Sequence, residues 1–109
     1  MNSLKVCFVG LGSIAKRHIK NLRDIASDNN YKLRIDVFRH GADAALPAEL
    51  VGISEVFSDF DSLYDDYDVI FITNPTVFHY DTLVKFKDKT KHFFIEKPVF
   101  TFEQLNYML

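Results

Sequence analysis

The stretch LKVCFVGLGSIA, residues 4–15, constrains the fold of this 109-residue chain more than any other. The β-branched and aromatic run at 4–9 predicts a strand that stops at Gly10. The residues that follow place their apolar positions on one face of a helix. These positions are Ile14, Ile19, Leu22, Ile25 and Ala26. A glycine-containing turn therefore joins a strand directly to a helix.

The turn itself, GLGSIA, has the pattern G-x-G-x-x-A, which in a strand–loop–helix unit is the fingerprint of dinucleotide binding. Gly10 permits the tight turn, Gly12 lets the backbone approach a pyrophosphate, and Ala15 lets helix and strand pack closely. The backbone N–H groups of Ser13 and Ile14, at the start of the helix, would face the phosphates. The alternative is a glycine-rich turn that binds no ligand.

The rest of the chain repeats the alternation of strand and helix. Further strands are predicted at 33–38, 55–57, 68–73 and 92–95. Helical segments are predicted as a short turn within 59–66, a helix over 77–88 and a final helix from Phe102. We expect an α/β fold, a Rossmann-type doubly wound parallel sheet of about five strands in the order 3-2-1-4-5, with helices on both faces. Residues 1–109 would form one dinucleotide-binding domain, although 41–54 stay ambiguous.

The strands differ in their expected burial. The continuous apolar run at 68–73 predicts a strand covered on both faces, and we also expect 93–95 to be buried. The alternation at 33–38 predicts a strand nearer the sheet edge than its centre, with one polar face. Thr101 and Gln104 fit a capping box for the final helix. In the helix over 77–88 the apolar positions are Val77, Leu83, Val84 and Phe86.

The residues at the end of the second strand bear on the choice of cofactor. An acid there would bind the ribose 2′-hydroxyl of NAD, whereas an arginine can accept the 2′-phosphate of NADP. Arg39 and His40 follow the strand directly, while Asp36 lies inside it and is expected to pair with Arg34 on the strand face. Arg39 therefore favours NADP over NAD. The alternative is a surface arginine that stacks on the adenine or is simply solvated.

Three motifs together are more specific than the glycine turn alone: GLGSIAKRH at the start, TNPTVFH after the fourth strand and EKP after the fifth. With them, the whole chain resembles the N-terminal domain of the Gfo/Idh/MocA oxidoreductases, which include glucose–fructose oxidoreductase and inositol dehydrogenase. The resemblance implies an NAD(P)-dependent dehydrogenase that transfers hydride between nicotinamide and a carbinol of a sugar, cyclitol, nucleotide-sugar or similar polyol.

The resemblance also implies roles for residues that follow the fourth strand. Thr73, Asn74 and Pro75 match the loop beside the ribose and nicotinamide end of the cofactor. His79 matches a histidine common at the start of the next helix. A helix-capping or packing role for His79 is as plausible as a cofactor contact.

A second set of implied roles follows the fifth strand. Glu96 matches a glutamate near the nicotinamide ribose, and Lys97 matches a lysine that reaches towards the reacting carbon of the substrate. A lysine there could orient a hydroxyl or take its proton as hydride leaves. The alternative is a solvated lysine at a strand end. Pro98 often follows a cis bond in such families. Three basic residues of the first helix would add only a favourable, non-specific field near the phosphates: Lys16, Arg17 and His18.

Family members also carry a second α/β domain, which holds the substrate pocket and usually the oligomer interface. The final helix starts with a good cap and ends after about two turns, so we expect the chain to be part of a larger protein. Alone, it would bind a dinucleotide without turning over substrate, and the parent would be a homo-oligomer. Rival interpretations are a non-catalytic dinucleotide sensor, or an enzyme that recycles a tightly held NADP.

Composition excludes several other classes. The formal net charge of −2 argues against a nucleic-acid binder. No apolar run approaches the ~20 residues of a membrane span, and the N-terminus is not a signal peptide; a cytoplasmic location is the simplest expectation. The single cysteine, Cys7, rules out an internal disulfide and is expected to be a buried, inert thiol. We predict no metal site.

Overall fold

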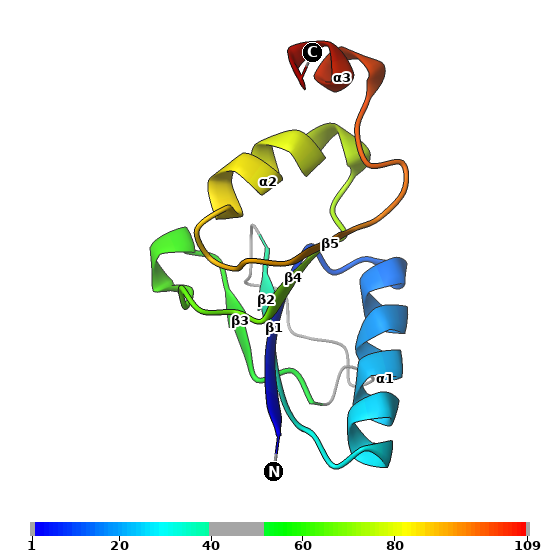
Figure 1. The fold of residues 1–109 in the computed structure, drawn as a ribbon, viewed down its shortest axis with the longest axis vertical. Coiled ribbons are helices and arrows are strands. Elements are labelled where there is room, and N and C mark those ends of the chain that lie inside the picture. Colours follow the sequence, from blue (N-terminus) through cyan, green and yellow to red (C-terminus); the bar gives the residue numbers. More distant parts are fainter. Residues whose placement is uncertain (1, 40–51, 109) are drawn as a thin grey trace.

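The computed structural model describes residues 2–39 and 52–108, and its centre is a five-stranded parallel sheet. The strand order is β3-β2-β1-β4-β5, as predicted (Figure 1). The strands are β1 Ser3–Val9, β2 Lys32–Phe38, β3 Glu55–Phe57, β4 Val69–Ile72 and β5 Phe93–Ile95. Their positions agree with the predicted runs to within a residue or two, because each run ends in turn-forming or charged residues.

Helices cover both faces of the sheet, which confirms the doubly wound architecture (Figure 1). The helices are α1 Ser13–Asp28, α2 His79–Phe86 and α3 Phe102–Met108, with 3₁₀ turns η2 Phe60–Ser62 and η3 Thr76–Phe78. The predicted capping box is present before α3. The Thr101 backbone N–H donates to Gln104 Oε1 at 3.0 Å, and the Gln104 N–H donates to Thr101 Oγ1 at 3.2 Å.

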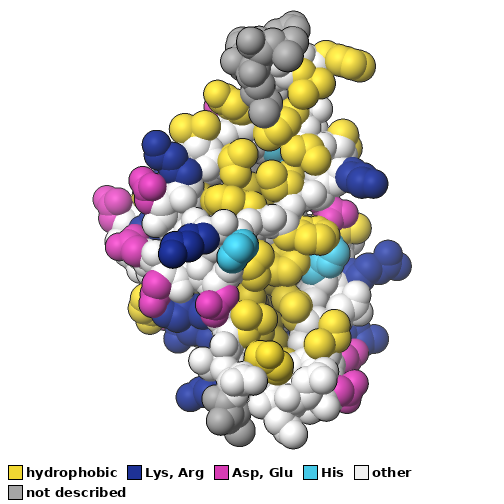
Figure 2. Space-filling view, in the orientation of Figure 1, with side chains coloured by type: hydrophobic (Ala, Val, Ile, Leu, Met, Phe, Trp, Pro, Cys, Tyr) yellow, Lys and Arg dark blue, Asp and Glu magenta, His cyan; other side chains and the backbone are white. Residues whose placement is uncertain are grey.

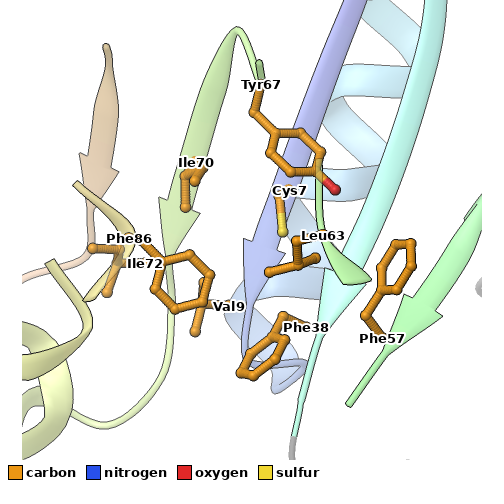
Figure 3. Packing of buried hydrophobic residues seen from close by; sticks show 9 residues of the cluster. All are labelled: Cys7, Val9, Phe38, Phe57, Leu63, Tyr67, Ile70, Ile72 and Phe86. Atoms are coloured by element: carbon orange, nitrogen blue, oxygen red, sulfur yellow. The ribbon is translucent and has the colours of Figure 1, made fainter. Parts of the chain in front are cut away.

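Two hydrophobic cores lie on opposite faces because successive side chains of a strand point in opposite directions. Val6 and Phe8 of β1 pack with Ala15 and Ile19 of α1. On the other face, the second core includes Phe86 of α2 (Figure 3). Its other buried members are Cys7, Val9, Phe38, Phe57, Leu63, Tyr67, Ile70 and Ile72. The sheet is therefore a buried central layer that can hold loops rigidly at its edges.

The outer strand β5 corrects one expectation. β4 is buried on both faces, as predicted. β5, however, pairs only with β4 among the described residues and is the edge of the sheet. Its middle residue, Phe94, is 43% exposed, so the run at 93–95 is not a buried strand. In Figure 2 hydrophobic side chains form a band down the middle of the view. An apolar run cannot by itself tell an edge from a centre.

The helical periods are also wrong at three positions. Ile25 of α1 is 58% exposed, Val77 is 56% exposed and Val84 is 50% exposed. The predicted helix over 77–88 divides into η3 and the shorter α2, and this change of helix type breaks the apolar phase. The buried positions of α2 are His79, Thr82 and Phe86.

In β2 the predicted polar face is not open to solvent, although β2 does lie next to the edge strand. Asp36 is fully buried and accepts a 2.7 Å hydrogen bond from the Tyr67 hydroxyl. Arg34 Nε donates to Asp36 Oδ2 at 3.3 Å, and Nη2 lies 3.1 Å from Oδ1, at ion-pair distance but without hydrogen-bond geometry. This confirms the predicted Arg34 pairing. Asp36 therefore belongs to the core and not to a ribose site.

His40 and most of the ambiguous segment 41–54 lie outside the described residues. Across residues 2–39 and 52–108, no helix combines the length and apolar character needed to cross a bilayer.

Candidate functional site

The carboxyl ends of four neighbouring strands are in register. The last residues of β2, β1, β4 and β5 are mutually paired: Phe38, Val9, Ile72 and Ile95. The residues that follow them form a row across the carboxyl ends of these strands: Arg39, Gly10, Thr73 and Glu96. Gly10, Thr73 and Glu96 each donate a backbone N–H to the neighbouring strand at 3.0–3.1 Å. With strands about 4.8 Å apart, the row spans roughly 14 Å.

Gly10 occupies a place that only glycine fills without strain. Its φ is +96°, and an added β-carbon would lie 3.0 Å from the backbone nitrogen of Asn74. The Thr73 hydroxyl fixes the same contact from the other side, because it donates to the carbonyl of Val9 at 3.1 Å. The first glycine of the motif is therefore required by the packing of two loops.

Gly12 differs, because nothing among the described residues requires its missing side chain. It caps α1 with φ −88°, and an added β-carbon would meet none of their atoms within 4 Å. Ala15 behind it is fully buried against the sheet. The first-turn N–H groups of Ser13 and Ile14 have no intrahelical acceptor, and the first turn of α1 has no acidic residue. This end of α1 is open to a phosphate.

Two pockets open along the row and share three residues. One, of about 360 Å³, is lined by the glycine turn and the loop after β4. The other, of about 330 Å³, lies on the α2 side. Gly10, Asn74 and Pro75 line both. The second pocket is mainly apolar, with walls from Val9, Phe38, Phe78 and Phe86 and polar groups from Arg39, Asp81, Thr82 and Lys85. Because they share three residues, the two pockets adjoin and form one trough along the row from Arg39 to Thr73.

Asn74, which lines both pockets, has an acceptor that no described residue uses. Its Nδ2 donates to the Thr82 hydroxyl at 2.8 Å. Its Oδ1 is buried and has no hydrogen-bond partner among the described residues. A buried acceptor without a partner is unfavourable, and because this oxygen has almost no exposed surface, a ligand hydroxyl would reach it only after the side chain turns toward the trough.

His79 lies beneath the trough. The residue is 1% exposed. Nε2 is 2.7 Å from the backbone oxygen of Asn74, and Nδ1 is 2.7 Å from that of Val99. Both nitrogens thus face the backbone, which favours the packing interpretation and leaves Asn74 between His79 and a ligand. The ring ties the loop after β4 to the segment after the Lys97–Pro98 bond, which is cis, as the resemblance implies.

At the far end of the row, Lys97 is exposed and Glu96 is partly buried. Glu96 Oε2 lies 3.2 Å from Nε2 of His18. Sequence reasoning placed His18 in a general field near the phosphates and missed this contact. The signal was available: His18 stands three residues after Ala15, which puts it on the sheet-facing side of α1.

Comparison with known proteins now bears on the fold and the site. Residues 4–109 match the GFO_IDH_MocA model, described as "Oxidoreductase family, NAD-binding Rossmann fold". The chain belongs to this family. The resemblance predicted from the three motifs is thereby confirmed. None of the curated proteins compared with the chain is similar enough to count as a match.

Solved structures agree with the family assignment. A scyllo-inositol dehydrogenase from Lactobacillus casei, with bound cofactor NAD(H) and scyllo-inositol, is 32% identical with a TM-score of 0.67. An NAD binding oxidoreductase from Klebsiella pneumoniae is 24% identical with a TM-score of 0.75, and at this identity supports the fold alone. Each alignment covers 97% of this chain but only 32% and 30% of those proteins. The chain spans about a third of their length.

Most residues predicted for the site therefore meet at the carboxyl ends of the strands. Those that line the two pockets are Gly10, Gly12, Ser13, Ile14, Arg39, Thr73, Asn74 and Pro75. Glu96, Lys97 and Pro98 follow β5, and Ala15 and His79 are buried behind the surface. Sequence reasoning missed Phe78 and Lys85, because the rule that ligands bind at strand ends does not reach into the following helix.

Proposed function

We propose that the chain binds NAD(H) or NADP(H) in this trough, as the dinucleotide-binding domain of an oxidoreductase. The observation that carries the proposal is the row from Arg39 to Glu96, with the open position of Gly12 beside it. Ligands of open α/β sheets bind outside the carboxyl ends of the strands. The NAD(H)-bound structure of the Lactobacillus casei dehydrogenase supports the proposal independently.

The chemistry of the trough suggests how the dinucleotide lies. The adenosine would enter the mainly apolar pocket beside Arg39, with Phe78, which is 53% exposed, at its wall. The pyrophosphate would face the N-terminus of α1, where backbone N–H groups and the helix dipole favour an anion. The nicotinamide end would then lie toward Glu96 and Lys97. The buried Oδ1 of Asn74, which has no hydrogen-bond partner among the described residues, would accept a hydroxyl of the ligand once its side chain turns toward the trough.

The finer choice between NAD and NADP rests on Arg39. Within the part of the chain that the structure describes, Asp81 is the only carboxylate that lines the adenosine pocket, and it comes from α2 and not from the end of β2. A guanidinium at the end of β2 suits a 2′-phosphate. We therefore keep the preference for NADP as a proposal.

The parent reaction would be hydride transfer between nicotinamide and a carbinol of a sugar, cyclitol or nucleotide-sugar. The bound nicotinamide supplies the hydride acceptor or donor. Lys97, exposed at the end of the row, would orient the substrate hydroxyl and exchange its proton. Comparison with a scyllo-inositol dehydrogenase supports a cyclitol or similar polyol. The substrate domain, the homo-oligomeric parent and the cytoplasmic location stay predictions of the sequence.

The rival function is a dinucleotide sensor that uses the same site without chemistry, since a fold alone does not fix function. Replacing Lys97 by Ala in the parent protein separates the two. An enzyme loses turnover while it still binds cofactor. A sensor turns over no substrate before or after the replacement.

Titration calorimetry with NADH and with NADPH tests the binding proposal. The wild-type chain should bind at least one of them with a dissociation constant below about 1 mM. Gly12→Ala should fold normally, because its β-carbon meets open space, yet bind at least about tenfold more weakly. If neither dinucleotide binds the wild-type chain at millimolar concentration, the proposal is wrong.

A further inference from the structure

His18 and Glu96 are 78 residues apart in the chain, yet their side chains meet where α1 passes the end of β5. Their Nε2 and Oε2 atoms lie 3.2 Å apart, and the two side chains are only 23% and 28% exposed. Among the side chains that the structure describes, His18 is the only one that contacts the Glu96 carboxylate through a hydrogen bond. The place of this carboxylate therefore depends on one partner.

The imidazole of His18 is itself held in place. Its ring lies edge-on to Phe94 with centroids 5.1 Å apart, and tilted against Phe71 at 5.8 Å. Phe71 in turn stacks on Phe8 at 4.5 Å, in the core beneath α1. An aromatic stack thus anchors the imidazole, and the imidazole anchors the carboxylate.

We propose that His18 is a positioning residue for the nicotinamide end of the site. It fixes Glu96 at the end of the row and, through it, the start of the segment that carries Lys97. The inference rests on the proposed function, since it concerns how this site receives its dinucleotide. One oxygen of Glu96, Oε2, is engaged by His18. Oε1 stays available to accept a hydroxyl of the nicotinamide ribose.

The physical advantage is pre-organisation. A glutamate side chain without a partner must give up rotamer freedom when it binds a ligand, and this lowers affinity. A carboxylate that is already held by His18 has lost this freedom before the ligand arrives. The effect should be confined to the half of the dinucleotide that reaches Glu96. The adenosine half, which lies at the other end of the row, should be indifferent.

The test compares NADH and NADPH with ADP, which lacks the nicotinamide and its ribose, on the full chain. His18→Phe keeps a ring against Phe94 but removes the hydrogen bond, and His18→Gln keeps a donor near the position of Nε2. The first should weaken binding of NADH or NADPH about threefold to tenfold and leave ADP unchanged. The second should restore most of the loss.

Two further variants refine the comparison. In a Glu96→Ala background, His18→Phe should have little additional effect, because the side-chain partner of His18 is already absent. His92→Phe is the matched control, since His92 is an exposed histidine directly before β5, at the end of this strand that lies away from Glu96. It should bind all three ligands as the wild-type chain does. Equal losses for ADP and the dinucleotides, or no loss for either, would overturn the inference.

Nuclear magnetic resonance separates this inference from the proposed function. The backbone amide signals of Glu96 and Lys97 should shift in His18→Phe without ligand and return toward their original positions in His18→Gln. Unchanged signals would overturn the inference whether or not dinucleotides bind. Absence of dinucleotide binding by the wild-type chain would instead contradict the proposed function, and the amide signals would still decide whether His18 positions Glu96.

Discussion

Gly10 and Asn74 are packed so closely that a β-carbon on Gly10 would lie 3.0 Å from the Asn74 backbone nitrogen. The turn after β1 and the loop after β4 therefore touch directly, and the contact brings the two halves of the trough together. The φ of Gly10, +96°, adds a conformational reason for glycine. The first glycine of the motif supports the fold, whereas the second leaves room for a ligand.

Replacing Gly10 by Ala should therefore destabilise the folded chain by about 1–3 kcal/mol. The positive φ and the contact with Asn74 both oppose the new methyl group. Denaturant unfolding measures the change. Gly12→Ala is the matched control, and its free energy of unfolding should fall by less than about 1 kcal/mol. Equal stability of the two variants would contradict this account of the turn.

Arg39 should set the preference between the two cofactors. Arg39→Ala should lower affinity for NADPH about tenfold and affinity for NADH much less, because only NADPH carries the 2′-phosphate. Parallel titrations give the ratio of the two affinities. Lys32→Ala removes one positive charge at the amino end of β2, away from the site, and should leave the ratio of the two affinities unchanged. An unchanged ratio in Arg39→Ala would remove the argument for NADP.

The core hydrogen bond between Tyr67 and Asp36 should contribute strongly to stability. Tyr67→Phe removes the donor from a fully buried carboxylate and should cost about 1.5–3 kcal/mol. Tyr64→Phe is the control, because Tyr64 is 42% exposed, and should change stability by less than about 0.5 kcal/mol. Thermal unfolding of both variants decides the matter, and a neutral Tyr67→Phe would show that the Tyr67 hydroxyl is not needed.

Cys7 should be inert in the folded chain. Burial raises the pKa of its thiol far above the ordinary 9.0, so no thiolate is present at neutral pH. Iodoacetamide should react only when the chain unfolds, and faster with the destabilised Gly10→Ala. The unfolded thiol ionises near pH 9.0 while the folded one stays protonated, so this group lowers stability as pH rises above that value. Rapid labelling of the folded chain at neutral pH would contradict the burial.

The sequence could predict that the site lies at the carboxyl ends of the strands. Each strand is followed by a turn or a charged residue, and parallel strands end on the same side of the sheet. It could not predict which apolar run was the edge strand, since Phe94 resembles the buried Phe71 in sequence. The predicted helix over 77–88 failed at Val77 and Val84 because a 3₁₀ turn changed the period. The spacing of His18 from Ala15 indicates the sheet-facing side of α1, but its contact with Glu96 also depends on how α1 lies across the sheet, which no local pattern records.

The most direct test of the central claim is to map NADH or NADPH onto the chain by backbone amide chemical shifts. The account predicts that saturation shifts the signals of Gly10, Gly12, Thr73 and Glu96, which follow the carboxyl ends of three strands or begin α1. Signals at the amino ends of the strands, such as those of Lys32 and His92, should not move. Shifts concentrated at these amino ends, or no shifts at saturating cofactor, would contradict the account.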